Sequence, residues 1–166
     1  MSKTSIRIIG IDPGFDRCGW AIGDFIAHHH QIIDYGLITT DRQQDLYTRL
    51  QDLDQQLTGV LNNYQPAEAA MENLFFQSNQ KTVMKVAEAR GVIMSALFRH
   101  HLPLTDYTPP QIKQAVTGFG RADKKAITKM VQLELKLLTT DKLLDDTLDA
   151  IAVMLTHAAT RQLHQL

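Results

Sequence analysis

Apolar residues follow two spacings along this chain, and the N-terminal part has the spacing and residue types of β-strands. Ile6 to Ile11 is a short, apolar, β-branched run, which predicts a buried strand. Gly19 to Phe25 and Gln31 to Ile38 are two further strand candidates. Their close succession predicts a three-stranded antiparallel meander.

The next part of the chain changes to the spacing of helices, interrupted by short apolar runs. Leucines at helical spacing predict an amphipathic helix over about residues 43–63, and Ala67 to Glu72 is short enough to be a strand. Leu104 to Tyr107 is another short strand. Between these strands, Thr82 to His100 predicts a long helix whose inward residues are Val83, Val86, Ala87, Val92, Ala96 and Leu97.

Three helices are expected after the last strand. Pro109-Pro110 suits the first turn of a helix that runs through Val116, and Gly118 to Gly120 forms a flexible loop. Asp123 can cap a helix that reaches about Leu138, and a final helix spans about Leu144 to Leu163. Strands followed by crossover helices imply parallel pairing beyond the meander. We therefore expect one α/β domain over residues 1–166, with a five-stranded mixed sheet flanked by helices.

Composition narrows the class of protein. Of the 166 residues, 44% are hydrophobic and 21% are charged, which excludes a disordered, collagen-like or coiled-coil chain. The single cysteine, Cys18, rules out a disulfide within the chain, argues against a cysteine-ligated zinc site and fits a reducing cytoplasm. The apolar run Ile6 to Ile11 is too short for a signal-peptide core or a membrane span. We expect a cytoplasmic protein without a membrane partner.

Charge is unevenly distributed beneath a net charge of -1. Residues 1–80 carry 5 Lys/Arg and 10 Asp/Glu, whereas residues 81–142 carry 11 and 5, a surplus of +6. The tail from residue 143 carries 1 and 3. A phosphate-binding surface beside a carboxylate metal site has this distribution. A solvated, lysine-rich helix face is the alternative interpretation.

Four acidic positions are candidates for chemistry. Asp12 follows the first strand directly, Glu72 ends the Ala67–Met71 strand, and Asp146 and Asp149 share one face of the last, largely apolar helix. Each has a plain alternative role: a turn residue, an exposed strand end, or an acidic first turn that complements the helix dipole. Together, however, they could meet at the carboxyl edge of the sheet, where sites in α/β folds form.

Four carboxylates in one place repel one another, and divalent cations relieve that repulsion. Mg²⁺ prefers such hard oxygen ligands. Two ions held by shared carboxylates can bind both the attacking and the leaving oxygen of a phosphodiester. The sequence therefore predicts a two-metal site for phosphodiester hydrolysis.

Five segments, in order along nearly the whole chain, resemble the RuvC-type Holliday junction resolvases of bacteria. The resemblance implies an RNase H-like fold and a homodimer with two active sites. It also implies Mg²⁺-dependent paired nicking of a DNA junction. The segments are Ile9 to Gly14, Met71 to Phe75, Ala89 to Val92, Gln111 to Lys124, and Asp146 to Ala152 followed by Thr156-His157.

The resemblance assigns roles to individual residues. Asp12, Glu72, Asp146 and Asp149 would be ligands of two Mg²⁺ ions, for which Mn²⁺ is a plausible substitute. Asp145 competes with Asp146, because it too lies one turn from Asp149. Hydrolysis would leave 5′-phosphate and 3′-hydroxyl ends. A branch-migration helicase complex of the RuvA and RuvB type is implied as a partner.

Basic residues would hold the DNA. Lys113 and Lys124 fall on the family's functional lysines, where a positive charge can hold the scissile phosphate or stabilise the transition state. Simple solubility is the alternative for Lys125 and Lys129. The other basic residues expected to contact DNA are Lys81, Lys85, Arg90, Arg121, Lys125 and Lys129.

Two adjacent aromatics, Phe75 and Phe76, follow Glu72. The family places an aromatic at the Phe75 position that stacks on an unpaired base, and stacking contributes about 1–3 kcal/mol per base. We expect Phe75 in that role and leave Phe76 open, since a buried core position is the default for phenylalanine. The run His28 to His30 is expected to be a surface cluster, because adjacent side chains point in different directions.

Three other classes of function compete with a junction nuclease. A sugar kinase or actin-like ATPase also opens with an Asp and glycines, as in Asp12-Pro13-Gly14, but needs two lobes. Another RNase H-like nuclease would act on RNA–DNA hybrids or pre-ribosomal RNA. A non-catalytic module would bind junctions without cutting them. The lysines between Gln111 and Lys125 and the aromatic pair favour the junction enzyme.

Overall fold

The computed structural model describes residues 5–26, 29–73, 80–135 and 144–163. Five strands form one sheet in the order β3-β2-β1-β4-β5. The strands are β1 (Ile6–Asp12), β2 (Arg17–Ile26), β3 (His29–Thr39), β4 (Glu68–Glu72) and β5 (Leu104–Tyr107). The predicted five-stranded mixed sheet is confirmed, while the treatment of residues 1–166 as one domain stays a prediction.

Strand pairing follows the predicted scheme. β1 with β2 and β2 with β3 are antiparallel, whereas β1 with β4 and β4 with β5 are parallel. β1 is the central strand, and alternate residues of a strand point to opposite faces. Ile9 and Ile11 pack into the core on one face and Ile8 into the core on the other. A strand covered on both faces explains why Ile6 to Ile11 is an uninterrupted apolar run.

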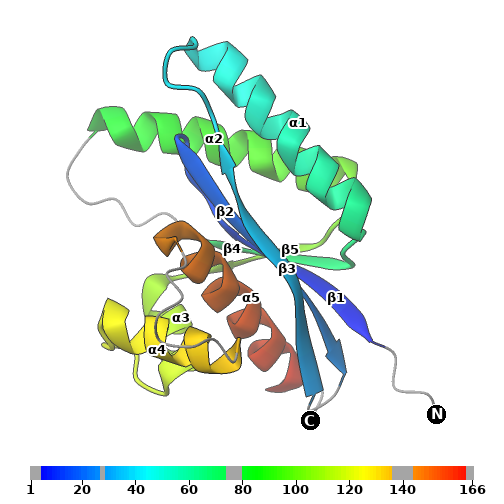
Figure 1. Ribbon diagram of the computed structural model, residues 1–166, viewed down its shortest axis with the longest axis vertical. Coiled ribbons are helices and arrows are strands. Elements are labelled where there is room, and N and C mark those ends of the chain that lie inside the picture. The colour runs from blue at the N-terminus through cyan, green and yellow to red at the C-terminus, as the bar shows by residue number, and fades with distance from the viewer. Residues whose placement is uncertain (1–4, 27–28, 74–79, 136–143, 164–166) are drawn as a thin grey trace.

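Helices cover both faces of the sheet (Figure 1). On one face lie α1 (Leu46–Tyr64) and α2 (Gln80–Arg99), and their leucines and isoleucines form one core with β1. On the other face, α5 (Asp145–Leu163) lies across the sheet, with α3 (Pro109–Thr117) and α4 (Lys124–Glu134) packed beside it. Among the helices described, none is both long and apolar enough to cross a bilayer.

Capping residues determine where α1 and α4 begin, whereas the apolar spacing predicted the start of α1 only approximately. The Asp45 side chain accepts hydrogen bonds from the backbone N–H groups of Tyr47 and Thr48, so α1 begins at Leu46 and not near residue 43. Asp123 caps α4, as predicted, through the N–H of Ala126. The expected extension of α4 to Leu138 lies outside the described residues.

The inward face of α2 includes two of the six predicted residues, Ala96 and Leu97, whereas the other four are exposed or only partly buried. Ala89, Ile93, Ala96 and Leu97 are buried, whereas Ala87 is exposed and Val83, Val86 and Val92 are only partly buried. Apolar residues occur on more than one side of this helix, so spacing alone did not select the side that packs on α1. The residues that repeat at i, i+4 and i+8, from Ala89 to Leu97, form that side.

Two glycines let α5 lie unusually close to the sheet. A Cβ atom added to Gly10 on β1 would come within 2.4 Å of the Ala150 carbonyl oxygen. One added to Gly19 on β2 would come within 2.0 Å of the Asp146 carbonyl oxygen. Both neighbours are backbone atoms of α5, which cannot move aside without moving the helix. Gly19 also pairs with Asp12 across β1 and β2. These contacts place the first turn of α5 directly over the end of β1.

Replacing Gly19 by alanine should therefore lower the stability of the protein, by about 1–3 kcal/mol in chemical denaturation, because the new methyl group forces α5 off the sheet. Gly59→Ala on α1 is the matched control, since a Cβ there meets nothing within 4 Å. That change should raise stability by about 0.5–1 kcal/mol through helix propensity. Equal stabilities for Gly19→Ala and the unaltered protein would contradict the packing described.

Candidate active site

The carboxyl ends of β1 and β4 carry two of the four candidate acids. Asp12 is the last residue of β1 and Glu72 the last of β4. Because these strands are parallel neighbours, both side chains emerge at one edge of the sheet. The first turn of α5, with Asp146 and Asp149, is held over the same edge by the close approach at Gly19. Chain folding thus brings together acids that are far apart in sequence.

Electrostatic interactions among these acids show how close they are. The pKa of Asp12 is raised to about 8, first by burial and then by the negative charges of Asp149, Glu72 and Asp146. The positive charge of Lys124 acts in the opposite direction. Without a further cation, the protein therefore favours the protonated, neutral form of Asp12 at neutral pH.

The pKa values of two neighbouring carboxyl groups, Glu72 and Asp149, are raised as well. Burial and the charge of Asp149 raise the pKa of Glu72, against the opposing charges of Lys124 and Lys113. Burial also raises the pKa of Asp149, although Lys124 lowers it. Raised pKa values at Asp12, Glu72 and Asp149 indicate that negative charge is concentrated here beyond what the local cations balance.

Lys124 is the cation most directly engaged. Its Nζ atom lies 3.2 Å from Oδ2 of Asp145 and 3.3 Å from Oδ2 of Asp149. Burial lowers the pKa of this lysine, but the two carboxylates outweigh that effect and raise it above its ordinary value. Lys113, Lys124, Glu72 and Asp149 line a cavity of about 230 Å³. The two lysines assigned from sequence thus border the acids.

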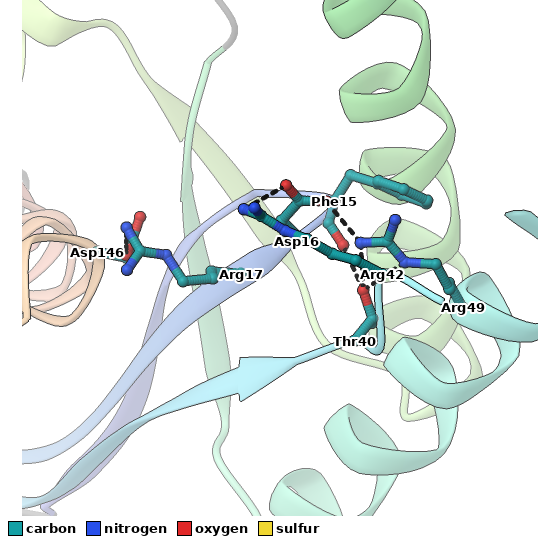
Figure 2. Close-up of polar contacts among 7 residues, drawn as sticks. All are labelled: Phe15, Asp16, Arg17, Thr40, Arg42, Arg49 and Asp146. Atoms are coloured by element: carbon teal, nitrogen blue, oxygen red, sulfur yellow. Dashed lines mark hydrogen bonds and ion pairs between the residues drawn. The ribbon is translucent and has the colours of Figure 1, made fainter. Parts of the chain in front are cut away.

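Asp145 and Asp146 are placed differently. The Asp145 side chain is 68% exposed and pairs with Lys124, whereas the Asp146 side chain is 23% exposed. Oδ2 of Asp146 lies 3.0 Å from Nη2 of Arg17 (Figure 2). This contact lacks hydrogen-bond geometry, and the oxygen is buried with no hydrogen-bond partner. Asp146 therefore presents an unsatisfied oxygen beside Asp12, and Asp145 does not.

The donor atoms fit divalent cations, although the carboxylates are not closed around a common point. Among the described residues, no three His, Cys, Asp or Glu side chains are near enough to hold one ion. Instead, Asp149 forms an ion pair with Lys124, and Asp146 forms one with Arg17. The unsatisfied oxygen of Asp146 and the raised pKa of Asp12 are both features that a hard cation would relieve.

The expected DNA-contacting residues lie at different places. Arg121 is exposed, and Lys125 and Lys129 line a cleft of about 380 Å³ along α4. Lys85 is exposed on α2. The Lys81 side chain, Phe75 and Phe76 lie outside the described residues, so their assigned roles stay predictions.

Arg90 has partners within the protein. Its Nη1 donates a hydrogen bond to the carbonyl oxygen of Glu72 at 2.8 Å, and its Nη2 donates one to Asp106 at 2.6 Å. These bonds tie α2 to the ends of β4 and β5. A DNA contact by Arg90 stays a prediction, and the bonds seen here hold the backbone that carries Glu72.

Among the three adjacent histidines, His30 also has a protein partner. Its Nε2 lies 2.8 Å from Glu134, and its ring stacks on Phe25. His28 lies outside the described residues. His30 thus joins the hairpin between β2 and β3 to α4.

Sequence reasoning overlooked the positive charge of the turn that follows Asp12. Arg17 contacts Asp146, and Asp16 pairs with Arg42 and Arg49 (Figure 2). These arginines lie in the acidic N-terminal half of the chain, outside the basic segment 81–142. An arginine five positions after a candidate metal ligand was the available signal.

Solved structures place this fold in a class. The Thermus thermophilus RuvC in complex with Holliday junction substrate is 28% identical, with a TM-score of 0.88 and coverage of 96% of both chains. The yeast mitochondrial Holliday junction resolvase shares the fold at 14% identity, with a TM-score of 0.71 over 96% of this chain and 81% of its own. The fold is therefore that of the RNase H-like junction resolvases.

Sequence comparison identifies the family. The model of the crossover junction endodeoxyribonuclease RuvC family matches residues 8–157. The Petrotoga mobilis crossover junction endodeoxyribonuclease RuvC is 43% identical over 155 residues, which cover 93% of this chain and 94% of that protein. The Brachyspira hyodysenteriae relative is 42% identical over 155 residues, covering 93% and 95%. This chain belongs to the RuvC family, and the resemblance stated from its motifs is confirmed.

Proposed function

We propose that this crossover junction endodeoxyribonuclease cuts with the acids at the ends of β1 and β4 and at the start of α5. It resolves Holliday junctions by hydrolysing phosphodiester bonds. The observation that supports this site is the concentration of four carboxyl groups, with the pKa of Asp12 raised to about 8, beside Lys113 and Lys124. Paired nicking of opposing strands, leaving 5′-phosphate and 3′-hydroxyl ends, is part of the proposal.

Asp12, Glu72, Asp146 and Asp149 are the residues that would hold two Mg²⁺ ions. Bound ions lower the pKa of the attacking water and stabilise the departing oxygen. The protein supplies the preorganised carboxylates on two strand ends and one helix, so little rearrangement of the backbone is needed. Mn²⁺ offers the same preference for oxygen ligands and is expected to substitute.

Lys113 and Lys124 provide positive charge on the substrate side of these acids. Lys124 is held by Asp149 and Asp145, and its raised pKa keeps it protonated at neutral pH. An ammonium group in this position can bind the scissile phosphate and stabilise the charge that builds up in the transition state. Lys113, which borders the same cavity, would share that role.

DNA beyond the cut would follow the exposed basic residues. Lys125 and Lys129 extend from Lys124 along α4, Arg121 precedes it, and Lys85 lies in the first part of α2, where Lys81 is expected to contribute as well. Phosphate contacts of this kind bind any DNA sequence. Selectivity for a branched junction would come from Phe75, with Phe76 as a second aromatic, stacking on an unpaired base.

The assembly is inferred from family membership. A homodimer with two active sites would allow two opposing strands to be cut together. A branch-migration helicase complex of the RuvA and RuvB type is the expected partner, in the cytoplasm. The buried Cys18, whose pKa burial raises to about 12, is an unreactive thiol in that setting.

The competing classes of function separate in one comparison of substrates. A junction resolvase cuts a synthetic immobile four-way junction in preference to linear duplex, whereas another RNase H-like nuclease prefers an RNA–DNA hybrid. A non-catalytic module cuts neither. The kinase-like alternative lacks support, since the described residues form one sheet and not two lobes.

Asp12→Asn should abolish nicking of such a junction in Mg²⁺ while leaving its affinity for the junction within about threefold. The amide keeps the size of the side chain but removes the negative charge needed to hold the cations. Nicking is measured on denaturing gels and affinity by fluorescence anisotropy in Ca²⁺. Full nicking activity in this variant would overturn the proposed site, and wild-type protein inactive on every junction tested would overturn the proposed activity.

A pair of neighbouring substitutions tests which aspartate of α5 is a ligand. Asp146→Asn should reduce the nicking rate by roughly 100-fold or more, because the buried oxygen beside Asp12 loses its charge. Asp145→Asn should reduce it by less than about fivefold, since this exposed side chain contacts only Lys124 among the described residues. A reversed order of the two rates assigns the ligand to Asp145 and contradicts our choice of Asp146.

A further inference from the structure

A second cavity adjoins the candidate active site and is larger than the one between the two lysines. Its volume is about 430 Å³, against about 230 Å³. Its walls are formed by the turn from Gly14 to Arg17, by Arg42, and by Lys85 and Val86 of α2. Asp146 closes the side that faces the acids. Asp146 is therefore shared by the cavity and the acidic cluster.

The turn from Gly14 to Arg17, which forms one wall of the cavity, is held in place by Arg49 and Thr40. Arg49 of α1, although buried, donates hydrogen bonds from Nη2 to Asp16 at 2.5 Å and to the Thr40 hydroxyl at 2.8 Å. The Thr40 hydroxyl in turn donates to the carbonyl oxygen of Phe15 at 2.9 Å. The Arg49 guanidinium also lies 3.9 Å from the centre of the Phe15 ring (Figure 2). The buried guanidinium therefore contacts Asp16 and Phe15 of this turn directly, and reaches the turn again through Thr40, which fixes the conformation of the turn.

Positive charge exceeds negative charge around the cavity. Arg17, Arg42 and Lys85 supply three cations to the lining, and Asp16 and Asp146 supply two anions, which leaves a surplus of one. Lys85 makes no ion pair with a described residue, and its Nζ lies 5.5 Å from the centre of the Phe15 ring. This surplus of positive charge favours the binding of an anion in the cavity.

Two of these cations are bound only loosely to carboxylates. Arg42 Nη2 lies 2.8 Å from Asp16, and the Arg42 side chain is 75% exposed. Arg17 Nη2 lies 3.0 Å from Asp146, and the Arg17 side chain is 48% exposed. The Arg42–Asp16 pair is exposed and therefore weak, and the Arg17–Asp146 contact lacks hydrogen-bond geometry although Oδ2 of Asp146 is buried. Either guanidinium can turn from its carboxylate to a phosphate, which it binds through two parallel hydrogen bonds.

We propose that this cavity is a subsite for one backbone phosphate of the junction strand next to the scissile phosphodiester, held by Arg17, Arg42 and Lys85. The proposal rests on the function given above, because only a strand cut at the neighbouring acids would pass Asp146. The volume of about 430 Å³ admits a phosphate and its sugar. Arg49 and Asp16 are positioning residues that hold the turn and do not touch DNA.

Binding measurements on the double variant R42Q/K85Q test the subsite, since neither residue belongs to the acidic cluster. Affinity for a fluorescent immobile junction, measured in Ca²⁺ at several salt concentrations, should fall by roughly tenfold. The logarithm of the association constant, plotted against the logarithm of the salt concentration, should have a slope that is shallower by about one for each subsite that binds the junction. This is the change expected when one phosphate contact is lost. Arg99→Gln is the control, because Arg99 is a half-exposed arginine paired with Asp54 at the far end of α2. It should change neither quantity.

A neutral phosphate analogue locates the contact. A methylphosphonate placed at one position adjacent to the cut should weaken binding by wild-type protein and by Arg99→Gln. The same substitution should have a clearly smaller effect on R42Q/K85Q, because only Arg17 of the three proposed phosphate ligands remains there. Should the double variant prove less stable to heat than wild type, Lys85→Gln alone provides the same comparison.

The outcomes separate this proposal from the one on which it rests. Wild-type affinity and salt dependence in R42Q/K85Q, with junction cleavage intact in the wild type, overturn the subsite alone. Equal sensitivity of variant and wild type to every methylphosphonate overturns it as well. Failure of the wild-type protein to bind or cut junctions overturns the proposed function instead.

Discussion

Asp12 ends the central strand of the sheet and lies among three other carboxyl groups. Burial and the charges of Asp149, Glu72 and Asp146 raise its pKa to about 8. This repulsion explains why Lys124 lies between Asp145 and Asp149, and why Arg17 lies against Asp146. The positions of the nearby cations follow from the need to offset a concentration of negative charge that the fold imposes.

The fold imposes that concentration through backbone packing. Parallel pairing of β1 and β4 sends Asp12 and Glu72 to one edge of the sheet. Gly10 and Gly19 allow α5 to approach the sheet so closely that its first turn lies over the same edge. The hydrophobic cores on both faces of β1 stabilise this arrangement. Folding energy from apolar burial thus holds like charges together that would otherwise separate.

The five strands, the directions of their pairing and the four candidate acids could be predicted from the sequence because they depend on local patterns. A few consecutive residues are enough to identify the β-branched run before Asp12 and the motif from Asp146 to Ala152. The inward face of α2 could not be predicted, since it depends on which side meets α1. The roles of Arg17 and Arg49 could not be predicted either. Arg17 pairs with Asp146 and Arg49 with Thr40, and these partners lie outside the elements that carry the two arginines. Long-range ion pairs have no periodic signal in sequence.

The most direct test is thermal unfolding of metal-free wild-type protein and Asp12→Asn from about pH 5 to about pH 9. A carboxyl group whose pKa is raised in the folded state stabilises the protein below its ordinary value of 3.8, and that stability is lost as pH rises to about 8. Wild-type protein should therefore lose stability relative to Asp12→Asn across this range. Mg²⁺ should restore the wild type at about pH 8 and leave the variant unchanged. Parallel pH profiles, with no selective effect of Mg²⁺, would contradict the account.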